Sequence, residues 1–303
     1  MKRSVILMGG KTFVLSLPSQ WIKRYQIRKG EELDIEERGS ELVVRPDSKL
    51  LAKEIEVDFS SLHKMLHRAV GALYKAGYTK VKVHYKDKEQ LQIIEKTLKR
   101  TLIGFEITQQ GENYVVIELL SRLVSEGFDV TLKRFFYSLE SMNQDLAQAL
   151  AAKKEREDLL RKVIEKDDQN NRLADFCRRV INTGETQHLE MVSNLYYITE
   201  QLERIGDLYK MMAEHVLQSK LHCSEESVAF LRDLHMLFVQ YRTLFFSFSL
   251  EGVEEFGKSF YSLKEKIKVL QQKENAESYF LFYEGVLLET IFDMNGVLLT
   301  RNV

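Results

Sequence analysis

Two carboxylates in the third quarter of the chain are spaced to act together. Glu203 and Asp207 lie four residues apart in a stretch whose apolar residues recur at helical spacing. Residues i and i+4 of an α-helix lie on the same face, and two carboxylates one turn apart can jointly ligate a hard or borderline cation. The spacing indicates a candidate metal site that a facing helix would complete. The alternative is a solvated helix surface with local salt bridges.

Gly206, between the two carboxylates, is a second signal at the same place. Glycine inside a helix costs about 1 kcal/mol relative to alanine. We therefore expect a neighbouring group to approach the helix closely at this position.

The first thirty residues concentrate positive charge. The whole chain has a formal net charge of −1, but this segment has seven basic residues and no Asp or Glu. Neutralisation of phosphates supplies most of the non-specific affinity of proteins for DNA, so the segment is a candidate DNA contact. The alternative is a solvated basic surface. The basic residues are Lys2, Arg3, Lys11, Lys23, Arg24, Arg28 and Lys29.

No pattern points to catalysis, so we expect a protein that is not an enzyme. There is no Walker-type or dinucleotide glycine loop, and the seven histidines show no HExxH spacing. The two cysteines, Cys177 and Cys223, are too few for a disulfide scaffold and suit a reducing compartment. No window approaches the roughly 18–20 uncharged apolar residues of a membrane span. We expect a cytoplasmic protein without membrane insertion.

The elements that carry these residues fall into three regions, which together predict an α+β multidomain fold. Residues 1–46 contain four short apolar or alternating runs broken by glycine turns, with one short helix around Pro18–Tyr25. So small a unit buries too little surface to stand alone, and we expect it to pair with a second copy.

Residues 47–126 predict a small α/β segment that serves as a spacer or a dimerisation unit. Apolar spacing predicts helices over 60–76 and 89–102, a strand over 79–85, and a hairpin formed by 105–109 and 114–119.

Residues 127–303 predict an all-α region of six long helices joined by short loops. The expected helices are 128–153, 155–182, 185–219, 224–248, 251–273 and 276–300. Short loops imply antiparallel neighbours, and the region divides into a first three-helix bundle, 127–220, and a second, 221–303.

The first region resembles the AbrB/SpoVT/MazE family of swapped-hairpin domains. The resemblance rests on Gly10–Pro18, on Trp21–Arg24 and on the Gly30-Glu31-Glu32-Leu33 strand start. It implies an intertwined homodimer that binds DNA through Lys11 in the loop and Lys23 in the helix. The supporting contacts would be Lys2, Arg3 and Arg24. Ile22 stands where some members have a second basic residue.

The third region resembles the PhoU family, whose Glu-Arg-Ile-Gly-Asp motif is present as Glu203–Asp207. The run Val163–Asp167, with Asn171 four residues on, resembles the acidic motif of the preceding helix. The resemblance implies tandem three-helix bundles and a divalent or trivalent metal ion such as Fe, Zn or Mg. The implied ligands are Asp167, Asn171, Glu203 and Asp207.

A weaker copy of the motif occurs in the sixth predicted helix. Leu288–Asp293 repeats the frame of Leu202–Asp207, with Phe292 in place of the glycine. The matching carboxylates are Glu289 and Asp293, and the second bundle is therefore expected to be degenerate.

The combination of regions resembles archaeal phosphate-uptake regulators. It implies a phosphate-responsive transcriptional regulator that binds promoters of phosphate-related genes. The alternative is an adaptor that restrains a phosphate-transporter ATPase or a sensor protein by direct contact, with the N-terminal region used only for dimerisation.

Overall fold

The structure is a computed structural model that describes residues 2–38, 41–46, 53–120, 126–152, 154–184, 186, 191–272 and 276–302. The chain divides into two compact units, Met1–Glu54 and Ile55–Val303. The predicted start of the α/β segment at residue 47 and the predicted helix start at residue 185 lie outside the described residues.

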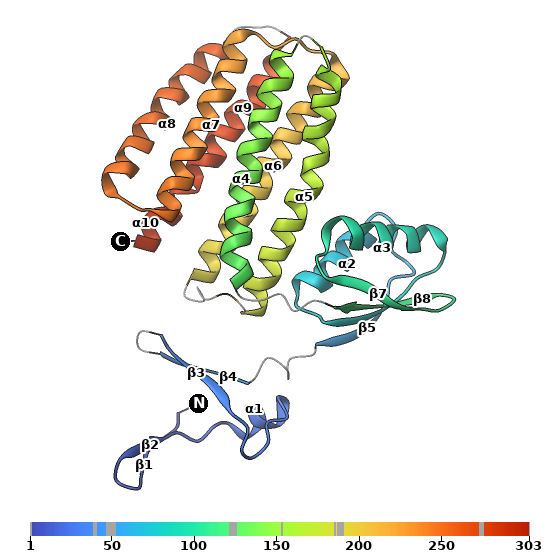
Figure 1. Cartoon of the computed structure of the whole chain (residues 1–303), viewed down its shortest axis with the longest axis vertical. Coiled ribbons are helices and arrows are strands. Elements are labelled where there is room, and N and C mark those ends of the chain that lie inside the picture. The colour runs from blue at the N-terminus through green and yellow to red at the C-terminus, as the bar shows by residue number, and fades with distance from the viewer. Residues whose placement is uncertain are drawn as a thin grey trace. The chain divides into compact units, whose positions relative to one another are not determined.

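The first unit consists of two antiparallel hairpins and a short helix (Figure 1). Gly9 and Gly10 close the first hairpin with φ of 64° and 74°, in the left-handed region that glycine adopts without steric cost. Pro18 immediately precedes the helix, as expected. The elements are β1 (Ile6–Met8), β2 (Thr12–Val14), α1 (Ser19–Arg24), β3 (Leu33–Arg38) and β4 (Glu41–Pro46).

The second unit begins with an α/β layer. Its strands have the order β5-β6-β8-β7, and β8 pairs antiparallel with both β6 and β7. Helices α2 and α3 cover one face of this sheet (Figure 1). Val81 and Val83 point into the core between the layers and are fully buried. The elements are β5 (Glu54–Asp58), α2 (Leu66–Lys75), β6 (Lys80–His84), α3 (Lys88–Thr101), β7 (Phe105–Gln110) and β8 (Tyr114–Leu119).

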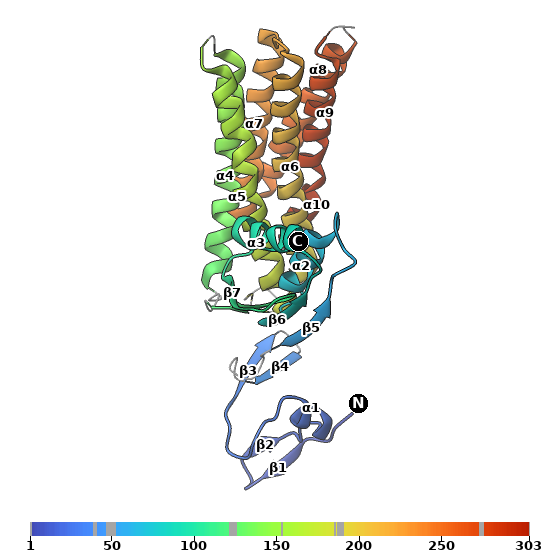
Figure 2. The ribbon, with the colours of Figure 1, turned by 90° about the vertical axis from the view of Figure 1, so that its right-hand side faces the viewer.

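The rest of the second unit is helical, with long helices that run side by side along one direction (Figure 2). Helices α4, α5 and α6 pack on one another, as do α7, α8 and α9, and the two bundles join where α4 contacts α7 and α6 contacts α9. The tandem arrangement is therefore confirmed. The helices are α4 (Glu126–Ala151), α5 (Arg156–Thr183), α6 (Val192–Ser219), α7 (Glu225–Phe246), α8 (Leu250–Gln271), α9 (Ser278–Asp293) and α10 (Asn295–Asn302).

Two helix boundaries differ from the sequence prediction for local reasons. The first helix of the α/β layer begins at Leu66 rather than at 60, because the Gln90 side chain donates to the carbonyl oxygens of Ser60 and Leu62 at 2.9 and 2.7 Å. The sixth long helix divides at Met294, where the side-chain amide of Asn295 donates to the carbonyl oxygen of Phe292 at 2.7 Å. Asn side chains compete in this way with the helical hydrogen-bond ladder.

The α/β segment has its own buried core and docks onto α5. Arg179, which is 1% exposed, donates to the carbonyl oxygens of Tyr74 and Tyr78 at 2.6 and 2.9 Å. Asn182, one turn further along α5, donates to the carbonyl oxygen of Lys75 at 3.0 Å. These contacts add donors from α5 to carbonyl groups in the last turn of α2 and just after it. The role of the segment as a spacer or as a dimerisation unit stays a prediction.

None of the helices in the described ranges is both long and apolar enough to cross a membrane.

Candidate functional site

The five predicted DNA-contact side chains lie on the surface of the first unit. Lys11 is in the turn between β1 and β2, Lys23 and Arg24 are in the last turn of α1, and Lys2 and Arg3 precede β1. All five are exposed, and in the part of the chain that the structure describes no carboxylate pairs with any of them. Their charges are therefore available to a polyanion.

The same unit exposes apolar side chains that a stable monomer would bury. Phe13, Ile35 and Leu42 are 73%, 66% and 69% exposed, and none of the unit's residues with a described burial is buried. Contiguous exposed apolar surface marks an interaction site. The other exposed apolar residues are Val5, Ile6, Leu7, Met8 and Leu15.

In the first helical bundle, Asp167 is the most buried of the predicted metal ligands. Its side chain is 3% exposed, and Lys210 of α6 lies 2.8 Å from its Oδ2 atom. The side-chain amide of Asn171 donates to the same oxygen at 3.0 Å. A buried charge requires such partners, and here an ammonium group and an amide supply them.

Asp207 lies close enough to Asp167 for the two carboxylates to affect each other. Burial raises the pKa of Asp207, and the charges of Asp167 and Glu203 raise it further. The structure thus brings Asp167, Asn171 and Asp207 together around Lys210, which stands three residues after Asp207.

Glu203 belongs to a different cluster, centred on Arg178 of α5. The Arg178 side chain is 5% exposed and forms ion pairs with Glu203, with Glu200 and with Asp175. Lys75 at the end of α2 lies 3.4 Å from the Asp175 carboxylate, so the cluster extends into the α/β layer. Burial opposes the charge of Arg178, but the surrounding carboxylates prevail and raise its pKa.

The close approach expected at Gly206 is confirmed. A Cβ atom at this position would lie 3.2 Å from Nδ2 of Asn170 and 3.3 Å from Cδ2 of Leu139. Asn170 is 1% exposed and is held by Ser138, whose hydroxyl donates to its Oδ1 atom at 2.7 Å. Glycine therefore lets α5 and α4 pack against α6.

The second copy of the motif has different surroundings. Glu289 pairs with Lys264 at 3.0 Å, and Asp293 is exposed. Phe292, in the glycine position, stacks on Phe260 of α8 with 3.6 Å between ring centroids. An aromatic contact thus occupies the place where the first bundle has a close backbone approach.

The described residues do not fit a resident metal ion in this arrangement. Among them, no three Asp, Glu, His or Cys side chains are grouped closely enough to hold one ion. Lys210 and Arg178 neutralise Asp167 and Glu203, so an ion would have to displace these cations. Metal binding stays a prediction.

Sequence reasoning missed the cations of both clusters. Arg178 and Arg179 follow the buried Cys177 in a helix whose apolar residues recur at helical spacing. Two consecutive arginines next to a buried position could have indicated that they are buried and paired. Lys210 had a comparable signal, since it lies three residues after Asp207 and hence on a neighbouring part of the same helix face.

The fold is that of a multidomain α+β protein. Residues 132–216 match the model of the PhoU domain, and residues 6–51 match that of MazE, the bacterial antitoxin of antidote–toxin recognition. The chain thus carries a PhoU domain over α4–α6 and a MazE/AbrB-like domain in its first unit. Both families are regulatory and non-enzymatic, one related to phosphate and the other of DNA-binding type. Searches of curated proteins and of solved structures found no match.

Proposed function

We propose that the protein is a homodimeric, cytoplasmic, phosphate-responsive transcriptional regulator. Its N-terminal unit binds promoter DNA of phosphate-related genes, and its PhoU domain relays phosphate status. The observation that carries the proposal is the N-terminal unit, in which exposed basic side chains occur beside apolar strands that have no internal core.

The exposure of the apolar strands supports dimerisation. A unit of this size buries too little surface to be stable alone, and Phe13 at 73% exposure gains most from a partner. A second copy offers the same strands and the same apolar side chains. Dimerisation also doubles the seven basic residues of the first thirty, which increases the number of phosphates that one module neutralises.

The test is a salt titration of DNA binding by the full chain. Binding to a promoter fragment of a phosphate-related gene is measured by fluorescence anisotropy, in the wild type and in the Lys11→Ala/Lys23→Ala double variant. We expect tight binding at low salt, and a salt slope that falls by about 0.9 for each phosphate contact removed.

A matched control removes two lysines elsewhere. Lys96→Ala/Lys99→Ala changes the same charge on the exposed face of α3 and should leave binding unchanged. DNA recognition by this unit would be refuted if the wild type did not bind at low salt, or if both double variants lost the same DNA affinity. The adaptor function, in which the N-terminal unit only dimerises, would then replace it. Binding to a transporter ATPase or a sensor protein would be its test.

A further inference from the structure

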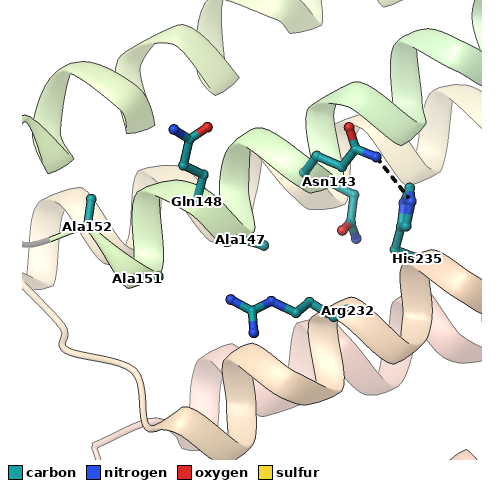
Figure 3. Close-up of a pocket in the computed structure, with 8 residues that line it drawn as sticks. Asn143, Ala147, Gln148, Ala151, Ala152, Arg232 and His235 are labelled. Carbon is teal, nitrogen blue, oxygen red and sulfur yellow. Dashed lines mark hydrogen bonds between the residues drawn. The ribbon is translucent and has the colours of Figure 1, made fainter.

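A groove between the two helical bundles carries polar groups that neither the PhoU motif nor the N-terminal unit uses. It has a volume of about 560 Å³ and lies between the second half of α4 and the first half of α7 (Figure 3). Helix α4 and Ala152, the residue that follows it, contribute six of the lining residues, and α7 contributes Arg232 and His235. The lining residues are Asn143, Gln144, Ala147, Gln148, Ala151, Ala152, Arg232 and His235.

Arg232 gives the groove a positive charge that nothing in the described chain neutralises. Figure 3 shows its side chain extending from α7 into the space beside Ala147 and Ala151 of α4. None of the eight lining residues is acidic, and no carboxylate in the described ranges pairs with Arg232.

His235 and the three amides of Asn143, Gln144 and Gln148 line the groove beside this charge. The His235 Nε2 atom lies 3.3 Å from Nε2 of Gln144, and its Nδ1 atom is buried without a hydrogen-bond partner. Burial lowers the pKa of His235, so its ring is neutral at neutral pH. Asn143 is 1% exposed and is fixed by donating to the Tyr209 hydroxyl at 3.2 Å. The guanidinium is therefore the single full charge of the lining.

We propose that this groove binds a small organic anion whose carboxylate or phosphoryl head is held by Arg232. A guanidinium matches either oxyanion with two parallel hydrogen bonds. The methyl groups of Ala147, Ala151 and Ala152 offer an apolar floor to the organic part, and the amides of Gln144 and Gln148 offer hydrogen bonds at the rim. Because the lining has one positive charge, it suits a ligand with one anionic head.

The proposal is tested with three probes that share one flat ring. Benzoate carries a carboxylate, phenyl phosphate carries a phosphoryl group, and benzamide has no charge. They are titrated into the full chain with ¹³C-labelled alanine methyl groups, because Ala147, Ala151 and Ala152 report from the groove itself. We expect saturable shifts of these methyl signals with benzoate, with phenyl phosphate or with both, and none with benzamide. The anion that binds more tightly identifies the head group.

Two variants and one control distinguish binding of the anion in the groove from non-specific attraction to a positively charged surface. Arg232→Met should weaken binding by roughly tenfold or more, the loss expected for a charge-assisted contact. Gln148→Glu should weaken it as well, since it places a negative charge at the rim of the groove. Arg161→Met removes an exposed charge on α5, outside the groove, and should have no effect.

The outcomes decide the proposal. It is overturned if neither anion shifts the three methyl signals, if benzamide shifts them equally, or if Arg161→Met weakens binding as much as Arg232→Met. Because Arg232 is exposed, the Arg232→Met variant should keep the alanine spectrum of the folded protein. If the groove does not bind an anion, the DNA-binding proposal is unaffected, because it rests on the N-terminal unit.

Discussion

The guanidinium of Arg179 donates to the carbonyl oxygen of Tyr74 at 2.6 Å and lies over the Tyr74 ring, 4.9 Å from its centroid. One residue of the PhoU domain thus contacts both the main chain and the side chain of a helix in the α/β layer. The neighbouring residue, Arg178, is at the centre of the carboxylate cluster that includes Glu203 of the PhoU motif. Two consecutive arginines of α5 therefore connect the motif with the α/β layer.

Replacement of Arg179 by methionine should loosen the α/β layer from the bundle. The carbonyl oxygens of Tyr74 and Tyr78 would lose their charged donor, and a hydrogen bond to a charged group contributes about 1.5–3 kcal/mol. We expect unfolding to become easier by about 2–4 kcal/mol. Hydrogen exchange of α2 and β6 should accelerate. Arg172→Met, at an exposed position on the same helix, is the control, and unchanged exchange in Arg179→Met would contradict the docking role.

Substitution of Gly206 by alanine should destabilise the protein although alanine favours helix. The new methyl group would meet Asn170 and Leu139 at 3.2 and 3.3 Å, and Asn170 is held on two sides by Ser138 and Met142. Overpacking of about 1–3 kcal/mol then exceeds a propensity gain of about 1 kcal/mol. Urea denaturation measures the difference.

Gly257 of α8 is the matched control for this substitution. A Cβ atom there meets nothing within 4 Å, so Gly257→Ala should stabilise the protein by about 0.5–1 kcal/mol. Both substitutions replace glycine by alanine, but we expect Gly206→Ala to lower the free energy of unfolding and Gly257→Ala to raise it. If Gly206→Ala also stabilises, the close approach of α5 and α4 is not a packing constraint.

The sequence predicted the helices well because their apolar spacing is long and regular, whereas cluster membership depends on tertiary contacts. Glu203 and Asp207 share one helix face, as their spacing predicted. Arg178 nevertheless draws Glu203 toward α5, while Asp207 lies near Asp167 and Lys210. Spacing along one helix fixes the direction of a side chain but not its partner on the next helix. Likewise, nothing local shows that Arg179 reaches 105 positions back to Tyr74.

A metal ion in the first bundle must compete with Lys210 for Asp167. In Lys210→Met the Asp167 carboxylate, 3% exposed, would lose its cation, and we expect a loss of about 2–3 kcal/mol in stability. If the predicted site binds Zn²⁺, Fe²⁺ or Mg²⁺, addition of the ion should restore the Tm of this variant more than it raises that of the wild type. Lys264→Met, which frees the half-exposed Glu289, should show no such recovery. The metal prediction fails if no ion changes either Tm and elemental analysis finds no metal.

Glu284 of α9 should make the stability of the second bundle depend on pH. It is fully buried, neither of its carboxylate oxygens has a hydrogen-bond partner, and burial raises its pKa well above the usual value, with a further contribution from Glu277. Lys266 acts in the opposite direction but does not prevail. The folded protein therefore keeps this carboxyl group protonated at pH values where the unfolded chain has already ionised it.

The sign of the effect follows from proton uptake on folding. Below the unfolded pKa of 4.5 both states are protonated, and Glu284 adds no pH dependence. Above it the folded state binds the extra proton, so the contribution of Glu284 to stability falls by about 1.4 kcal/mol per pH unit until the folded pKa is reached. Glu284→Gln has nearly the same shape and cannot ionise. We expect its stability relative to wild type to be nearly constant up to about pH 4.5 and to rise steadily at higher pH.

Chemical denaturation at a series of pH values from acid to neutral measures this difference. Glu95→Gln is the control, because it makes the same substitution at an exposed position on α3, outside the core of the second bundle. A flat difference for Glu284→Gln as well would mean that the wild-type carboxyl group ionises without penalty, and hence that water or a cation reaches it in the folded protein. A rising difference would show instead that the second bundle holds a neutral acid in its core, where the first bundle holds the paired carboxylate of Asp167.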